Sequence, residues 1–333
     1  MNYDDIVNLK STEELRRRLK DMPKFMHEFF KGISDRTSFR TRTSYACDLN
    51  LFLEYFSKIR NKEIKEITLD DLDSITVEEL EDYMEYITFY EKKRGQKVVI
   101  MKNDERAKSR KLASIRTLYK YFLKKRKIKF NIPQLIEPPK VHEKAIVRLE
   151  VDEVSKLLDE VEKGDKLTHN QFVCHEKTKF RDLAIISLLL GTGIRISECV
   201  GINIKDINFK ENGIRVLRKG GNESIVYFGD EVRQALKDYA KQRKTIKPLE
   251  GHETAFFLSM HRKRITVRAV QKLVQKYTNL VTPNKKISPH KLRSTFGTNL
   301  YHETGDIYLV ADVLGHKDIN TTKKHYADMN EDR

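Results

Sequence analysis

Apolar residues recur every three or four positions through most of the first third of the chain. Residues at this spacing lie on one side of an α-helix, so the pattern predicts amphipathic helices that pack through one face. The stripes are Leu15, Leu19, Met22, Met26 and Phe29; Tyr45, Leu49, Phe52 and Phe56; Leu80, Tyr83, Ile87 and Tyr90; and Leu112, Ile115, Leu118, Tyr119 and Phe122. We therefore expect a helical first third, with a loop near residues 102–104 before its last helix.

The pattern changes over residues 132–144, where three prolines interrupt a segment without helical spacing. Proline removes a backbone donor and restricts its neighbours, so such a segment is typical of an extended connection. We predict a helical domain over residues 1–136, a linker over 137–148 and a second domain over 149–333.

The second domain mixes strand and helix patterns. Three short apolar runs, Ile204–Phe209, Ile214–Arg218 and Ser224–Phe228, are separated by turn sequences rich in glycine and asparagine. Such turns predict a small antiparallel meander. Helices are expected at residues 152–161, 180–190, 230–243, 266–280, 289–304 and 306–314, with a surface loop over 164–177. The predicted fold class is mainly α with a small antiparallel β-sheet.

The net charge of the chain indicates what kind of partner it binds. Its 333 residues include 65 Lys and Arg against 49 Asp and Glu, a formal net charge of +16. This excess favours a polyanion such as DNA, because each neutralised phosphate releases condensed counterions. A merely soluble basic protein is the alternative. The candidate DNA contacts, which lie on two basic helices, are Arg42, Arg106, Arg110 and Lys111.

Other classes of protein are disfavoured. No apolar run approaches the roughly 20 residues that span a bilayer, and the N-terminus lacks the layout of a signal peptide. Three cysteines, Cys47, Cys174 and Cys199, are too few and too scattered for a disulfide framework or a zinc site. We therefore expect a cytoplasmic protein that does not contact the membrane.

The sequence also lacks the common motifs that bind nucleotides and metals. Gly191–Ile196 lacks the last glycine of a dinucleotide fingerprint, and the sequence contains neither a GxxxxGK[ST] loop nor HExxH. It also shows no obvious carboxylate cluster for Mg²⁺. We predict no cofactor and no metal, so any DNA cleavage must stabilise charge with the protein's own cations.

Three short motifs in the second domain carry residues suited to that task. Arg195 follows a Gly-x-Gly turn, with Glu198 three residues further on. His290 and Arg293 lie one helical turn apart. Tyr326 follows a Leu-Gly-His turn near the end of the sequence. Each has a structural alternative: a salt bridge for the first, a capping or core histidine for the second, and a core tyrosine for the third.

Taken together and in this order, the motifs resemble the tyrosine recombinase (phage integrase) family. The family's G-x-G-x-R-x-S-E box corresponds to Gly191–Glu198, its H-x-x-R box to His290–Arg293, and its L-G-H turn to Leu314–His316. Its nucleophile corresponds to Tyr326, and its lysine in a β-hairpin turn matches Lys219, with Arg218 beside it.

The resemblance implies a role for each residue around a scissile phosphate. Arg195 and Arg293 would grip the non-bridging oxygens, which guanidiniums do bidentately and lysines cannot. His290 and His316 would add hydrogen bonds and manage protons. Glu198 would orient Arg195 without reacting.

The same resemblance implies a covalent mechanism. Tyr326 would attack phosphorus and form a 3′-phosphotyrosyl bond, while Lys219 would protonate the 5′-oxygen that leaves. A phenol with a pKa near 10 attacks poorly until a positive site favours the phenolate or a neighbour accepts its proton. Because the covalent bond conserves the bond energy, religation would need neither ATP nor metal.

The expected function is therefore site-specific DNA recombination. A helical core-binding domain and an α+β catalytic domain would clamp DNA like the letter C. The implied partners are double-stranded recombination sites, further copies of the chain in a tetrameric synaptic complex, and an accessory DNA-bending factor. Integration or excision of a mobile element is the expected role. Xer-type chromosome-dimer resolution, a type IB topoisomerase-like nicking-closing enzyme and a non-catalytic DNA-binding factor stay open as alternatives.

Overall fold

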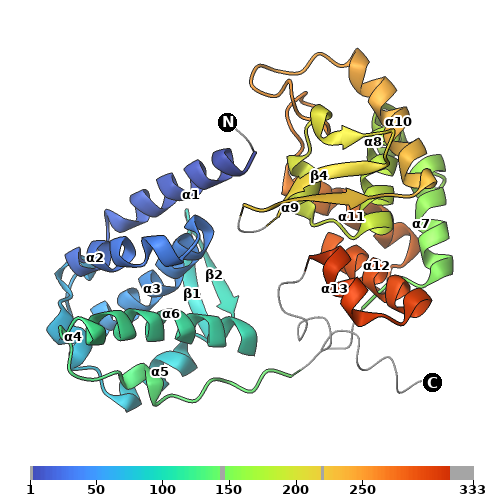
Figure 1. The fold of residues 1–333 in the computed structure, drawn as a ribbon. Coiled ribbons are helices and arrows are strands. Elements are labelled where there is room, and N and C mark those ends of the chain that lie inside the picture. The colour runs from blue at the N-terminus through green and yellow to red at the C-terminus, as the bar shows by residue number, and fades with distance from the viewer. Residues whose placement is uncertain (1–2, 143–146, 219–220, 316–333) are drawn as a thin grey trace. The chain divides into compact units, whose positions relative to one another are not determined.

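The computed structural model describes residues 3–142, 147–218 and 221–315 of the chain (Figure 1). It separates into two compact units, Met1–Glu143 and Lys144–Arg333. Each unit has its own arrangement of secondary structure, and we describe the two in turn.

The first unit is helical apart from one β-hairpin. Its elements are α1 (Tyr3–Leu19), α2 (Lys24–Gly32), α3 (Phe39–Ile59), α4 (Leu69–Asp73), α5 (Val77–Tyr86), β1 (Phe89–Arg94), β2 (Lys97–Lys102) and α6 (Glu105–Lys124), with short 3₁₀ turns at Ser34–Arg36, Ile64–Glu66 and Ile132–Gln134. Polar side chains cap the helix starts: Ser38 accepts a hydrogen bond from the Thr41 amide, and Thr76 and Glu79 form a capping box.

Aromatic side chains fill the core of this unit. Phe52 of α3 lies 5.3 Å from Tyr83 of α5, and Phe25 of α2 lies 5.7 Å from Phe122 of α6, both between ring centroids. Burying each such side chain contributes about 1.5–3 kcal/mol. The apolar stripes predicted for α3 and α6 are confirmed, because all their members are buried or partly buried.

The hairpin β1–β2 was not predicted. The sequence pattern extended the third helix to Tyr90, whereas α5 ends at Tyr86 and the chain turns into an antiparallel pair that aligns Phe89 with Lys102. Tyr90 is buried, but it reaches the core from a strand. Gly95 at the tip has φ +60°, a conformation that glycine adopts without steric cost.

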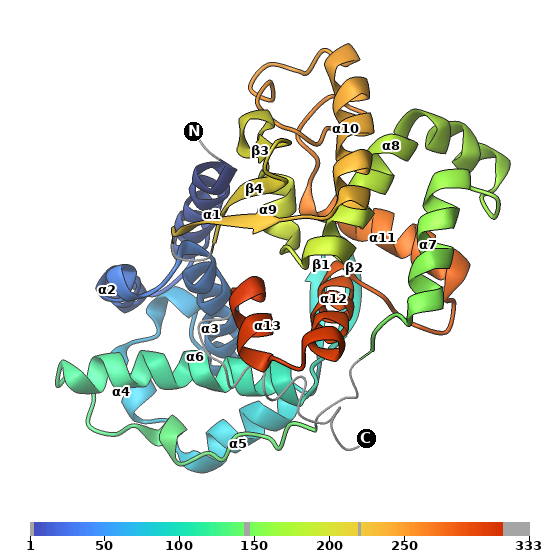
Figure 2. The ribbon, with the colours of Figure 1, turned by 45° about the vertical axis from the view of Figure 1, so that its right-hand side comes forward.

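The second unit combines a small antiparallel sheet with helices. Its elements are α7 (Val151–Lys163), α8 (His169–Thr192), α9 (Ile196–Gly201), β3 (Ile207–Asn208), β4 (Gly213–Leu217), β5 (Glu223–Tyr227), α10 (Asp230–Thr245), α11 (Val267–Val281), α12 (Pro289–Thr304) and α13 (Ile307–Leu314), with a 3₁₀ turn at Ile204–Asp206. The strands pair antiparallel in the order β3-β4-β5, which confirms the predicted meander. Figure 2 shows α8 against α10, and α12 beside α13.

The expected surface loop over residues 164–177 is wrong, because α8 already begins at His169. The first turns of α8 expose almost every side chain and therefore carry no apolar stripe. A buried polar contact anchors them: the ring Nδ1 of His175 lies 3.0 Å from the hydroxyl of Tyr277 in α11, and that hydroxyl donates to Asp182. A polar core contact of this kind is invisible to hydrophobic periodicity.

The fold class is confirmed as mainly helical with small antiparallel sheets. Within the described residues, no helix combines the length and the apolar character that crossing a bilayer requires.

Candidate active site

The turn between α8 and α9 presents Arg195 and depends on two glycines. Gly193 ends α8 in the left-handed region at φ +58°, and a Cβ on it would lie 2.5 Å from Cδ1 of Phe296 and 2.8 Å from Cδ2 of Leu314. A Cβ on Gly191 would lie 2.5 Å from Cγ2 of Val232. Close packing therefore requires both glycines of the Gly-x-Gly motif.

Arg195 is held in place by Glu198. Its backbone amide donates to Oε2 of Glu198 at 2.9 Å, and its Nη1 donates to Oε1 at the same distance. The Arg195 side chain is 32% exposed, whereas that of Glu198 is 4% exposed. The salt bridge expected as the structural alternative is therefore present, and it leaves part of the Arg195 side chain exposed.

Arg293 lies deeper, on α12, and is only 5% exposed. Its Nη1 donates to the carbonyl of Gly193 at 2.6 Å, and its Nη2 donates to the carbonyl of Leu314. Arg293 thus joins the turn that presents Arg195 to the end of α13. The chain brings together two arginines that are separated by almost a hundred residues.

The carboxyl end of α13 is the common anchor of this cluster. Nη2 of Arg195 donates to the carbonyl of Gly315 at 3.1 Å, and Arg293 donates one residue earlier. Arg218, at the end of β4, also donates there, to Leu314 at 2.7 Å and Val313 at 3.1 Å. The last carbonyls of a helix lack intrahelical partners and carry partial negative charge, so they attract cations. From the sequence, Arg218 is distinguished only as the neighbour of Lys219.

His290 lies in the first turn of α12, directly after Pro289, and its side chain is exposed. It does not occupy the core, so the alternative of a core histidine is excluded. Its carbonyl accepts a hydrogen bond from the hydroxyl of Ser294 at 3.1 Å. Lys219, His316 and Tyr326 lie outside the described residues, and their roles stay predictions.

The cluster contains cations but, in the described part of the chain, no group of His, Cys, Asp and Glu side chains that could hold a metal. Burial also raises the pKa of the Cys199 thiol, next to Glu198, to about 12. That cysteine is therefore a neutral core residue and cannot supply a thiolate nucleophile.

Two tyrosines near the cluster bear on the nucleophile. The apolar neighbours of Tyr301 and Tyr308 in the sequence predict that both are core residues, and Tyr301 does pack against Val310 and Leu314. Tyr308 is 60% exposed, so the same assignment is wrong for it. It lies on the outer face of the short helix α13, where an apolar neighbourhood in sequence does not mean burial.

The candidate DNA contacts lie in the first unit and differ in exposure. Arg106 and Arg110 are exposed, and Arg110 bonds to Ser44 and Asp48. Arg42 is half-buried, with its guanidinium 4.4 Å from the ring centroid of Phe39.

Lys111 does not fit the prediction of a DNA contact. It is 6% exposed, and its Nζ lies 3.2 Å from Oδ1 of Asn103 and 3.6 Å from Oδ1 of Asp48. Burial lowers the pKa of this lysine. We correct the prediction: Lys111 is a structural partner of Asp48, on the buried side of a helix whose other side is basic.

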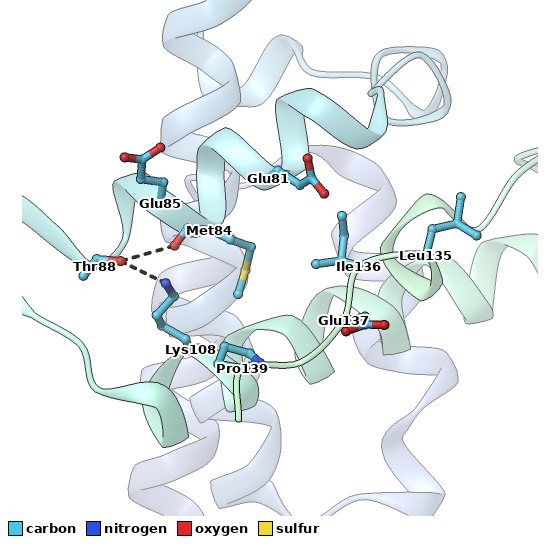
Figure 3. Close-up of a pocket in the computed structure, with 9 residues that line it drawn as sticks. All are labelled: Glu81, Met84, Glu85, Thr88, Lys108, Leu135, Ile136, Glu137 and Pro139. Carbon is cyan, nitrogen blue, oxygen red and sulfur yellow. Dashed lines mark hydrogen bonds between the residues drawn. The ribbon is translucent and has the colours of Figure 1, made fainter. Parts of the chain in front are cut away.

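An open cavity of about 550 Å³ in the first unit is unsuited to phosphate chemistry (Figure 3). The carboxylates of Glu81, Glu85 and Glu137 line it and would repel a phosphodiester. Among the described residues that line it, Lys108 is the only cation, and it donates to Thr88 Oγ1 at 2.9 Å. The arginine cluster of the second unit is the better candidate site.

Comparisons with known proteins agree on the class of this chain. Residues 147–333 match the phage integrase family. The chain is 34% identical to tyrosine recombinase XerC of Caldanaerobacter subterraneus subsp. tengcongensis over 316 residues, which cover 90% of this chain and 82% of the relative. It is 31% identical to tyrosine recombinase XerD of Staphylococcus epidermidis over 229 residues, which cover 68% and 73% of the two chains.

Solved structures share the fold. XerH recombinase bound to palindromic difH substrate matches with a TM-score of 0.65 and 20% identity, covering 87% of this chain and 77% of that one. The Tn1549 transposon integrase in complex with circular intermediate DNA matches with a TM-score of 0.63 and 20% identity, covering 90% and 93%.

Proposed function

Because the chain belongs to the phage integrase family of tyrosine recombinases, it is a site-specific recombinase that breaks and rejoins DNA, and we propose that the arginine cluster holds the scissile phosphate. The observation that carries the proposal is the convergence of Arg195 and Arg293 on the turn at Gly193 and the end of α13. Two guanidiniums fixed in this way are preorganised for the charge that develops on phosphate oxygens.

In this mechanism the phenol of Tyr326 gives its proton to a neighbouring imidazole, and its oxygen forms a bond to phosphorus while the bond to the 5′-oxygen breaks. Lys219 supplies the proton that the leaving oxygen takes up, and the product is a 3′-phosphotyrosyl enzyme with a free 5′-hydroxyl. Attack by a 5′-hydroxyl reverses the steps and releases Tyr326. The number of phosphoester bonds is unchanged, so the cycle requires no external energy.

The remaining residues support the phosphate and the protons. Glu198 keeps Arg195 oriented through its two hydrogen bonds. His290 and His316 are proposed to donate hydrogen bonds to the phosphate and to accept the proton of the phenol. Arg293, being buried, contributes a charge whose position is fixed by carbonyls before substrate arrives.

The first unit is proposed to bind the duplex beside the cleavage site. Arg106, Arg110 and Arg42 remain candidate phosphate contacts, and Lys111 is removed from that set. The XerH recombinase structure is bound to difH substrate and the Tn1549 integrase structure is in complex with circular intermediate DNA, which supports a DNA-binding role for this chain. Assembly of four copies on two sites is part of the same proposal.

Two biological roles compete, and the relatives favour one. The sequence relatives described above are named XerC and XerD, which supports Xer-type resolution of chromosome dimers. Mobile-element integration, the role expected from sequence, has support from structural neighbours at 20% identity or less, such as the Tn1549 transposon integrase and lambda integrase. Sequencing DNA covalently trapped by the protein in its source cells separates them: one fixed chromosomal locus indicates resolution, whereas element junctions indicate integration.

The mechanism is tested with a suicide duplex that contains the trapped site and a nick that prevents religation. We expect a covalent DNA adduct with the wild type, unchanged by EDTA, and none with Tyr326→Phe. Tyr308→Phe is the matched control, because it removes an exposed hydroxyl from the same region and should leave the adduct intact. Absence of an adduct with the wild type would favour the non-catalytic DNA-binding factor. Relaxation of supercoils without joining of two labelled duplexes would favour the topoisomerase.

A further inference from the structure

Arg218 is the third guanidinium at the carboxyl end of α13. Its Nη1 donates to the Leu314 carbonyl at 2.7 Å and its Nη2 to the Val313 carbonyl at 3.1 Å. The Leu314 carbonyl also accepts from Nη2 of Arg293. One oxygen atom thus joins a strand-end arginine to a buried arginine of the candidate site.

The fit at this point is close. Gly315 has φ +62°, and a Cβ on it would collide with Nη1 of Arg218. The guanidinium therefore lies directly across the backbone of Gly315, whose own carbonyl accepts from Arg195. In the described part of the chain, the hydrogen-bond partners of the Arg218 side chain are the carbonyls of Val313 and Leu314.

The backbone of Arg218 is equally fixed. Its amide donates to the Asn222 carbonyl at 2.8 Å, and its carbonyl accepts from the Gly221 amide at 3.1 Å. These two hydrogen bonds fix the position from which the Arg218 side chain reaches α13. Its planar fork reaches two successive carbonyls, a geometry that the single ammonium of lysine does not reproduce.

We propose that Arg218 is a positioning residue: it fixes the end of α13 so that the Leu314 carbonyl holds Arg293 in place for the phosphate. This inference rests on the proposed function of Arg293. It assigns Arg218 no contact with DNA. The helix end provides partial negative charge that stabilises the three cations together.

A double-mutant cycle on the cleavage step tests the proposal. Single-turnover cleavage of the suicide duplex is measured for Arg218→Ala, Arg293→Ala and the double variant. We expect Arg218→Ala to slow cleavage about 10- to 100-fold, as misplacement of a catalytic group does. Arg293→Ala should slow it about 100- to 1,000-fold. The double variant should lie within about 3-fold of Arg293→Ala, because the two residues act through one position. Additive losses would overturn the proposal.

Two further variants separate positioning from charge and from misfolding. Arg218→Lys keeps the charge and should be nearly as slow as Arg218→Ala; a rate close to wild type would overturn the proposal. Arg215→Ala is the matched control on the same strand, since Arg215 pairs with Asp206 and is 47% exposed. It should cleave within about 2-fold of wild type, as expected for a surface pair.

A duplex with a methylphosphonate at the scissile position distinguishes the possible failures. Its methyl group replaces one charged oxygen, so an arginine needed only for that charge becomes dispensable. We expect both stereoisomers together to restore Arg293→Ala and Arg218→Ala to within about 3-fold of wild type on the same duplex. Rescue of Arg293→Ala alone overturns the role of Arg218. Rescue of neither overturns the role proposed for Arg293, and the inference with it. Restored activity also shows that the variants fold.

Discussion

Replacing Gly193 with alanine should damage both the stability of the second unit and its arginine cluster. Two costs can be worked out from the structure. The residue has φ +58°, and an L-residue in this region costs about 1–2 kcal/mol. The new Cβ would also lie 2.5 Å from Phe296 and 2.8 Å from Leu314, and overpacking of this kind costs about 1–3 kcal/mol.

The free energy of unfolding should therefore fall by about 2–5 kcal/mol. For a unit of this size, such a loss lowers the melting temperature by about 4–20 °C. Calorimetry and urea denaturation of the full chain measure both quantities. Cleavage should also slow, because relief of the overlap displaces Leu314, whose carbonyl holds Arg293.

A second glycine separates the two costs. Gly305 has φ +67°, but a Cβ on it would meet nothing within 4 Å. Gly305→Ala should therefore lose only the conformational part, about 1–2 kcal/mol, and should cleave DNA normally. If Gly193→Ala and Gly305→Ala lose equal stability, the argument that close packing requires the Gly-x-Gly motif is refuted.

Three other predictions concern charge. Glu198→Gln keeps the shape of the side chain but weakens the hold on Arg195, so single-turnover cleavage should fall about 10-fold or more while DNA affinity changes little, as paired rate and filter-binding measurements would show. Arg106→Ala should lower DNA affinity and reduce the slope of log affinity against log salt by about 0.9, if it contacts one phosphate; an unchanged slope contradicts that contact. Lys111→Met should leave this slope unchanged, yet lower the free energy of unfolding by about 1–3 kcal/mol, because it removes a buried partner of Asp48.

Sequence patterns predicted the helices that pack through one continuous apolar face. α6 is an example, since Leu112, Ile115 and Phe122 recur at helical spacing and all are buried. The same reasoning missed the start of α8, where exposed polar residues surround the buried contact between His175 and Tyr277. Periodicity detects a hydrophobic face, and it cannot detect a helix whose anchor is a hydrogen bond between polar groups.

The candidate site shows a similar division. Motif spacing identified Arg195, Glu198 and Arg293, and the structure brings these three to one turn and one helix end. The burial of Lys111 and the role of Arg218 could not be predicted, because both depend on what a distant segment places beside the side chain. The charge of Lys111 and the residues next to it in the sequence do not reveal whether its side chain faces water or Asp48.

A helix carboxyl end is at first sight an unfavourable neighbour for a phosphate, since both are negative. The charges resolve the difficulty. Three guanidiniums bring three positive charges, whereas the end of a helix carries about half a negative charge. The cluster around Leu314 therefore keeps a net positive potential while each carbonyl removes rotational freedom from an arginine. Orienting these side chains before the substrate binds lowers the entropy lost in reaching the transition state. The carbonyls at the end of α13 thus orient Arg293, as the carboxylate of Glu198 orients Arg195. Because a carbonyl carries only a partial charge, it neutralises the guanidinium less than a carboxylate does.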